Sequence, residues 1–236
     1  MANFKTHVSV AAALSGGLAT GFLAVGIAAP QEVWLYFAMG TLGGILPDID
    51  ANNSIPGRML FSFFAMVLAF LTLFSRTSVY SIVELSILWI VTYGIVRYII
   101  FQMFARLTVH RGIFHSILAA VFFFFLTTNI SYYLFSLDPL TAWICGLFIF
   151  IGYIIHLSLD EMYSVDLIGT KIKKSFGTAL KIISRNMKVT FLLFLATVVV
   201  FYMTPSAERF VKTVLSFDTY KSVKVKLLPK AGWFKL

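Results

Sequence analysis

The sequence predicts an all-α, polytopic helical membrane protein with about six to seven transmembrane helices. Three observations support this fold class. The chain of 236 residues is 59% hydrophobic and only 12% charged, whereas soluble domains carry about 25% charged residues. Its mean hydropathy is +0.90. The apolar stretches have helix length and lack the alternation of a transmembrane barrel, so helices must satisfy the backbone groups within lipid.

The apolar stretches predict the spans in chain order. They cover residues 8–29, 33–47, 58–75, 79–104, 113–135, 139–157 and 188–204. A span needs about 20 apolar residues, so the second and seventh stretches are short. We expect the second to be tilted or partly inserted, and the seventh to be a span or a re-entrant or interfacial segment. The first stretch is longer than a signal-peptide core and is expected to be retained.

Prolines and glycines in these stretches predict helix ends and helix contacts. Pro30, Pro47, Pro56 and Pro139 are expected at helix boundaries. The glycine pairs 17/21 and 40/44 have the small-residue spacing that lets helices approach closely.

The remaining segments complete the predicted organisation. A helical membrane domain occupies 1–204, with an amphipathic cytoplasmic helix in the loop 158–187, and 205–236 forms a basic tail. Within the tail, 217–228 is expected to be a short strand or an amphipathic membrane-surface segment. The single cysteine, Cys145, lies in an apolar run and is expected to be a core residue.

Alternate threading of the spans predicts the orientation. It puts the N-terminus and the loops 47–57, 105–112 and 158–187 on one side, and these segments are rich in lysine and arginine. The loops of the opposite side carry Arg76 alone. The positive-inside rule makes the basic side cytoplasmic. The net charge of +9 is therefore ascribed to topology and to anionic lipid rather than to nucleic acid, because no basic stretch is interleaved with exposed aromatic residues.

The same threading gathers imidazoles and carboxylates on the cytoplasmic side. The predicted metal ligands are His7, Asp48, Asp50, His110, His115, His156 and Asp160. Imidazole and carboxylate together suit zinc, manganese, iron or nickel, whereas calcium prefers oxygen alone. Seven ligands exceed one tetrahedral site, so one or two divalent ions are expected, with zinc favoured.

Each part of this set also has a structural interpretation. His156 and Asp160 are four residues apart on one helix face, which suits either a metal or a histidine–carboxylate hydrogen bond. Asp48 and Asp50 can hold a cation or form an Asx-turn. Arg111 is a candidate for binding a phosphate or an ordinary topogenic arginine.

The motifs resemble those of a known family. An early histidine, LPDID at 46–50, HRGIFHS at 110–116 and H-x-x-x-D at 156–160 resemble the YdjM-like inner-membrane family. The resemblance covers roughly residues 1–165, and the chain beyond corresponds to no motif known to us. It implies a membrane-bound, metal-dependent hydrolase, similar in motif logic to zinc-dependent phospholipase C.

The expected function is therefore metal-dependent hydrolysis of a phosphoester or other ester bond in a lipid or lipid-linked substrate, at the bacterial inner membrane. Asp48, Asp50 and Arg111 are the expected catalytic residues, and Ser116 and Glu161 the expected partners that orient ligand histidines. The alternatives are a metal-ion transporter and a non-catalytic protein with a structural His/Asp cluster. A transporter would place its ligands near mid-membrane, whereas these lie at helix ends.

Overall fold

The computed structural model describes residues 3–50, 55–74, 76–77, 79–102, 114–163, 181 and 187–226. These residues form helices and turns, with no β-strand among them, which confirms an all-helical polytopic membrane protein. The chain divides into two compact units, Met1–Ile45 with Ser116–Leu236 and Leu46–His115. We describe each unit by itself.

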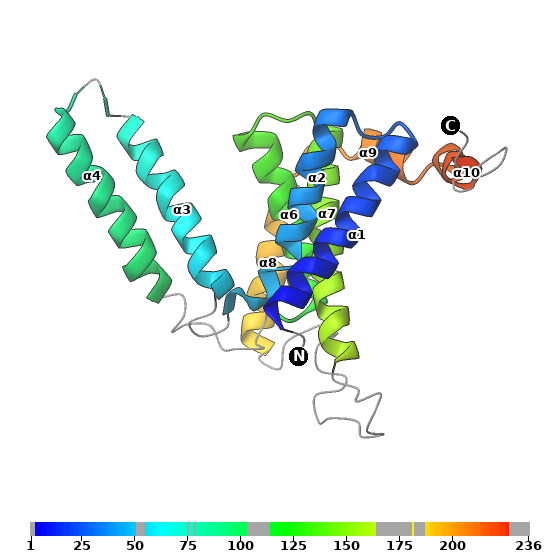
Figure 1. Ribbon diagram of the computed structural model, residues 1–236, viewed down its shortest axis with the longest axis horizontal. Helices are drawn as coiled ribbons and strands as arrows, with labels where there is room; N and C mark the ends of the chain where they lie inside the picture. Colours follow the sequence, from blue (N-terminus) through cyan, green and yellow to red (C-terminus); the bar gives the residue numbers. More distant parts are fainter. Residues whose placement is uncertain are drawn as a thin grey trace. The chain divides into compact units, whose positions relative to one another are not determined.

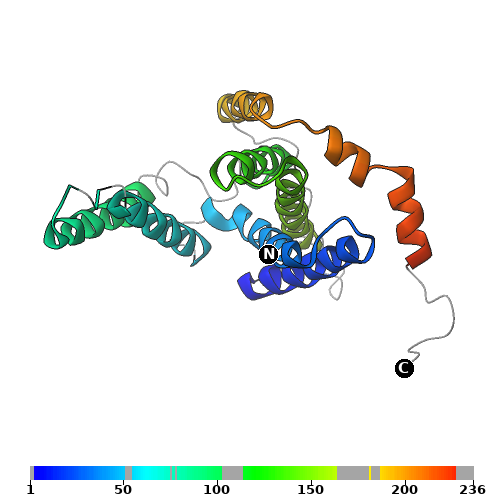
Figure 2. The ribbon, with the colours of Figure 1, turned by 90° about the horizontal axis from the view of Figure 1, so that it is seen from above.

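The first unit is built around one long helix, α7. Its helices are α1 (Phe4–Ala24), α2 (Pro30–Gly43), α6 (Ile117–Asn129) continued by the π-helical η3 (Ile130–Leu134), α7 (Pro139–Met162), α8 (Met187–Tyr202), α9 (Glu208–Val214) and α10 (Phe217–Lys226). Helix α7 contacts α1, α2, α6 and α9, and α8 packs on α6. Figures 1 and 2 show α1, α2 and α6 grouped around α7.

Local sequence signals explain where these helices begin. The side chain of Asn3 caps α1 by accepting a hydrogen bond of 2.8 Å from the Thr6 amide. Pro30 and Pro139 occupy the first turns of α2 and α7, which confirms them as helix boundaries. The amide of Ala29 donates to the Glu32 carboxylate over 2.6 Å, as in a capping box.

Four described segments are long and apolar enough to cross a membrane: Phe4–Ala24, Ile82–Ile100, Ile117–Leu134 and Pro139–Met162. Their bounds differ from the predicted spans. The first begins four residues earlier and ends five residues sooner than 8–29, because Gly26 adopts a positive φ of 80° and ends the helix. Helix α7 continues to Met162 beyond the predicted end at 157. Helix α2 has 14 residues, which at about 1.5 Å per residue is too short to span the bilayer upright.

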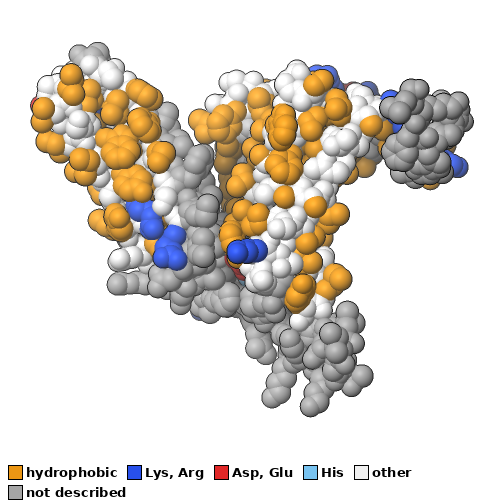
Figure 3. All heavy atoms as spheres, in the orientation of Figure 1, with side chains coloured by type: hydrophobic (Ala, Val, Ile, Leu, Met, Phe, Trp, Pro, Cys, Tyr) orange, Lys and Arg blue, Asp and Glu red, His pale blue; other side chains and the backbone are white. Residues whose placement is uncertain are grey.

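The second unit contains a helical hairpin. A 3-10 turn, η1 (Leu46–Asp50), precedes α3 (Ile55–Phe74), which packs against α4 (Ile82–Gly94) and its π-helical continuation η2 (Ile95–Ile100). Large apolar side chains on these helices are exposed, and Figure 3 shows hydrophobic side chains over much of the visible face of the hairpin. Such a surface is suited to lipid.

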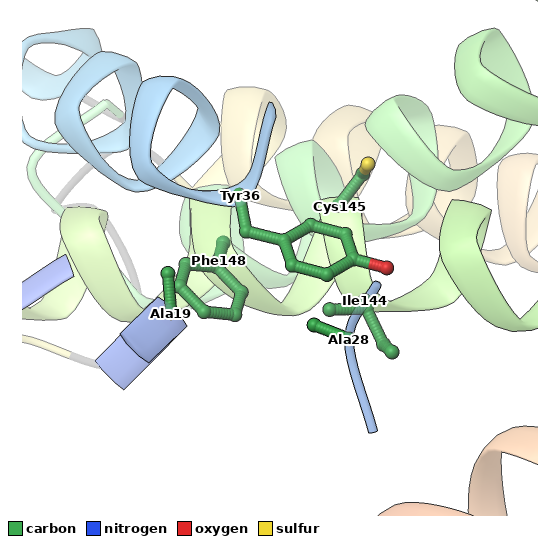
Figure 4. Packing of buried hydrophobic residues seen from close by; sticks show 6 residues of the cluster. All are labelled: Ala19, Ala28, Tyr36, Ile144, Cys145 and Phe148. Carbon is green, nitrogen blue, oxygen red and sulfur yellow. The ribbon is translucent and has the colours of Figure 1, made fainter. Parts of the chain in front are cut away.

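The core of the first unit lies where α1, α2 and α7 meet. The rings of Tyr36 in α2 and Phe148 in α7 stack with their centroids 5.3 Å apart, and Ala19 of α1 lies beside them. Figure 4 shows this packing, with Cys145 in the same cluster. Cys145 is fully buried, as predicted for a core residue.

Glycines bring the backbones of α2 and α7 into direct contact. A Cβ at Gly152 would overlap the carbonyl oxygen of Gly40, and a Cβ at Gly43 would overlap the carbonyl of Ile149. A Cβ at Gly40 would overlap the Ser15 side chain of α1, and a Cβ at Gly44 would overlap the Ala11 methyl group, so the predicted packing role of the pair 40/44 is confirmed by its contact with α1. The pair 17/21 does not pack in this way, because a Cβ at either position meets no atom of the described residues within 4 Å.

One of the two structures predicted for residues 217–228, the short strand, is wrong. Residues 217–226 form the helix α10 rather than a short strand. Of the loop 158–187, residues up to Met162 continue α7, and the predicted amphipathic helix lies mostly outside the described residues.

Candidate metal centre

Two helices of the first unit place three predicted ligands together. His7 lies in the first turn of α1, and His156 and Asp160 lie in the last two turns of α7. All three are at most 2% exposed. Because the start of α1 meets the end of α7, the cluster sits at one end of the helix bundle rather than at its middle.

The distances within this cluster match those between ligands of one metal ion. Nε2 of His7 lies 3.3 Å from Oδ1 of Asp160, and Nε2 of His156 lies 3.8 Å from Oδ2 of the same carboxylate. Atoms bound at 2.0–2.2 Å to a tetrahedral metal are about 3.3–3.6 Å apart. The three side chains can therefore hold a divalent cation.

The two imidazole rings lie face to face. Their centroids are 3.8 Å apart and their planes differ by 12°. Metals bind imidazole through a ring nitrogen. Both rings direct Nε2 toward Asp160, which places two nitrogen donors beside one carboxylate.

A backbone carbonyl fixes the tautomer of His156. Nδ1 of His156 lies 2.7 Å from the carbonyl oxygen of Gly44, and because a carbonyl only accepts, Nδ1 carries the proton. In the neutral ring, Nε2 then presents its lone pair toward Asp160. A metal-binding histidine usually donates its second N–H to a carbonyl or carboxylate in this way.

The position of Asp160 also favours a cation nearby. A carboxylate that is 1% exposed loses its hydration. It lies two residues before the end of α7, where the helix dipole disfavours negative charge. A cation bound by the cluster would offset both costs.

The second unit brings another predicted pair together. Nε2 of His115 lies 3.8 Å from Oδ1 of Asp48, which belongs to the turn η1. His115 is 1% exposed, and the Asp48 side chain is 18% exposed. The distance is too long for a hydrogen bond and suits two ligands of one ion.

The structure leaves three predicted site residues untested. His110 and Arg111 lie outside the described residues, and the side chain of Asp50 is not described. Ser116 caps α6, because its hydroxyl accepts from the Ala119 amide over 3.3 Å, so its predicted role beside a ligand histidine stays a prediction. Glu161 lies in α7 next to Asp160, and its predicted role also stays a prediction.

Sequence reasoning missed the residues that support His156. Gly44 supplies the carbonyl that holds the ring, and Gly152 allows α2 to approach α7 closely enough for that contact. The spacing of Gly40 and Gly44 indicated a close helix approach. It could not indicate that the approach positions a ligand.

One family model matches most of the chain. A model described as YdjM inner membrane protein matches residues 1–221. The match extends past residue 165, where the motifs end, and includes α8, α9 and the first half of α10. No curated protein matches the chain, and no solved structure matches it.

Proposed function

This chain belongs to the YdjM inner membrane protein family, and from that premise we propose that it is a membrane-bound, metal-dependent hydrolase. The substrate we propose is a phosphoester or other ester bond of a lipid or lipid-linked molecule. The observation that carries the proposal is the buried cluster of His7, His156 and Asp160, whose donor atoms have the spacing of metal ligands.

The chemistry of the cluster favours zinc over harder ions. Two imidazole nitrogens with one carboxylate form a common donor set of catalytic zinc, and manganese, iron and nickel accept the same donors. Three protein ligands leave a fourth tetrahedral position for water or substrate. When bound, such an ion would lower the pKa of water to about 7 and so supply a nucleophile at neutral pH.

The residues of the chain have separate roles in this proposal. Asp160 lies beside Nε2 of both histidines and would neutralise part of the ion's charge. The Gly44 carbonyl accepts from Nδ1 of His156, which selects the tautomer whose Nε2 lone pair faces Asp160. Asp48 and Asp50 are proposed to hold a second ion or to act as general base, and Arg111 to bind a phosphate oxygen. The assignment of Asp50, His110 and Arg111 is carried by the sequence motifs alone.

The membrane arrangement completes the proposal. We place six to seven spans in the chain and the metal cluster toward the cytoplasm, because the predicted loops of that side carry the excess of lysine and arginine. A lipid substrate would then enter from the bilayer and present its head group at the end of the bundle. The partners we propose are the lipid bilayer and the lipid or lipid-linked substrate. We do not propose that the protein binds nucleic acid.

Elemental analysis combined with hydrolysis assays tests the proposal. Purified protein should contain a stoichiometric divalent metal, and His156→Ala should lose it together with hydrolysis of phosphoester lipids. Glu32→Gln, a carboxylate change at the opposite end of the bundle, is the matched control and should keep both. Full metal content in His156→Ala would refute the assignment of the ligands.

One alternative is favoured by a specific observation. The three described ligands are almost fully buried, as in structural zinc sites, which have no open position. In that case the metal would tie α1 to α7 without catalysis. Metal loss and reduced thermal stability in His156→Ala, with no hydrolysis by the metal-loaded wild type across phosphoester and ester lipids, would favour this alternative.

A further inference from the structure

An apolar groove lies at the end of the first unit away from the metal cluster. It has a volume of about 390 Å³ and runs between the last turns of α1 and the helix α10. Leu18 and Phe22 line it from α1, and Tyr220, Val223 and Lys226 line it from α10. Its lining is apolar except for Thr219 and Lys226.

Helix α10 has the features of a helix that lies on a membrane surface. It is seen end-on in Figure 1 and lengthwise in Figure 2, so it runs across the bundle rather than along it. Phe217 and Tyr220 are 78% and 64% exposed. Three lysines and one aspartate give the helix a net positive charge. Exposed aromatic residues beside lysines are typical of the boundary between head groups and acyl chains.

Two contacts fix α10 and its neighbour to the bundle. The Lys226 ammonium donates to the carbonyl oxygen of Ala24, the last residue of α1. In α9, the ring of Phe210 stacks on Trp143 of α7 with the centroids 5.5 Å apart. The groove is therefore a built feature of the first unit, with a cation at its rim and an apolar floor.

We propose that this groove binds one acyl chain of an anionic phospholipid, with the head-group phosphate at Lys226 and the neighbouring lysines of α10. An acyl chain suits the apolar floor, which Leu18 and Phe22 of α1 and Val223 of α10 line. An anionic head group suits the rim, because a lysine near the surface favours an anionic lipid by about fivefold in affinity. The site is separate from the metal cluster and does not depend on the proposed hydrolysis.

Native mass spectrometry of the delipidated full chain tests this proposal. Phosphatidylglycerol and phosphatidylcholine with identical chains are titrated in turn. We expect phosphatidylglycerol to bind several-fold more tightly than phosphatidylcholine. Lys226→Gln should weaken phosphatidylglycerol binding about fivefold or more and bring it close to that of phosphatidylcholine. Lys212→Gln removes an exposed lysine of α9 paired with Glu208, and as the matched control it should leave the difference intact.

A second variant separates the groove from the rim. Val223→Trp would fill the groove while leaving Lys226 in place, and it should weaken both lipids. Equal binding of the two lipids by the wild type would overturn the proposal. Unchanged lipid binding in both Lys226→Gln and Val223→Trp would also overturn it. A dimeric wild type and a monomeric Val223→Trp variant with unaffected lipid binding would do the same, because the groove would then hold a second copy of the chain.

Discussion

The two ends of the bundle formed by α1, α2 and α7 both carry acidic side chains, half-buried Glu32 at one end and buried Asp160 at the other, and these have different surroundings. At one end Glu32 accepts hydrogen bonds from the Ala29 amide and from the Thr141 hydroxyl, at 2.6 and 2.7 Å. At the other end the ring nitrogens and the Asp160 oxygens stand 3.3–3.8 Å apart. The first two distances are those of short hydrogen bonds, and the second range includes the distance of about 3.3–3.6 Å that separates atoms bound to one tetrahedral ion.

This difference distinguishes a structural carboxylate, Glu32, from the proposed metal ligand Asp160 within one set of helices. Asp138 caps α7 by accepting from the Leu140 amide over 3.0 Å, so the acidic groups near the start of α7 have hydrogen-bond donors within the protein. Near the end of α7, neither ring nitrogen of His7 makes a hydrogen bond to the described residues. The comparison predicts that substitutions at the two ends affect different measurements.

The largest expected effect is on metal affinity. Asp160→Asn should weaken binding of zinc by more than about 100-fold, because loss of a direct ligand exceeds the 10–100-fold cost of losing an outer partner. Glu32→Gln should leave zinc affinity within about twofold. Competition with a zinc chelator measures both values. Equal zinc affinities in Asp160→Asn and Glu32→Gln would contradict the proposed difference between the two ends of the bundle.

The next effect concerns the backbone contact that supports His156. Gly152→Ala places a methyl group against the carbonyl of Gly40 and the amide of Gly44. Overpacking of this kind should lower the free energy of unfolding by about 1–3 kcal/mol. It should also weaken metal binding, because the Gly44 carbonyl would shift away from the His156 ring. Reversible unfolding in mixed micelles and the chelator assay measure the two effects.

Gly17→Ala is the matched control for that variant. A Cβ at Gly17 meets nothing within 4 Å in the described part of the chain, and alanine favours a helix over glycine by about 0.5–1 kcal/mol. Stability should therefore be unchanged or raised, with normal metal content. A loss as large as that of Gly152→Ala would show that the glycine contact is not the cause.

An effect on stability alone, without the loss of metal binding, is expected at the opposite end. Thr141→Val removes the hydroxyl that donates to Glu32 and should lower the free energy of unfolding by about 1–3 kcal/mol. Metal content should not change, because the cluster lies at the other end of α7. A parallel loss of metal would indicate that the two ends are coupled through the helix.

The smallest effect is expected at the exposed cap of α1. Asn3→Ala removes the acceptor of the Thr6 amide and should cost about 1 kcal/mol of stability. His7 lies in the same turn, so zinc affinity should fall slightly, by less than for Gly152→Ala. Thermal unfolding with and without zinc separates the two contributions, and an effect on affinity larger than that of Gly152→Ala would reverse the ranking.

The sequence predicted the candidate site best where residues that can bind a metal also follow the period of a helix. The four-residue spacing of His156 and Asp160 predicted a shared helix face, and α7 provides it by continuing to Met162. Threading predicted that His7 would reach the same end, as it does. Helix ends were predicted less well, because apolar residues continue past the end of α1 and do not reveal the turn at Gly26. The carbonyl of Gly44 was not predictable, since a backbone acceptor has no signature in a side-chain pattern.

The contact of α2 with α7 has a consequence for how this protein can diverge. The acceptor that orients His156 is a main-chain atom, and it is held in place by the close contact at Gly43 and Gly152, where an added Cβ would meet main-chain atoms. Selection therefore has no side chain there through which to adjust the orientation in small steps. Relatives that acquire a new substrate would be expected to do so through residues around the cluster, while positions 40, 43, 44 and 152 stay closed to anything larger than hydrogen.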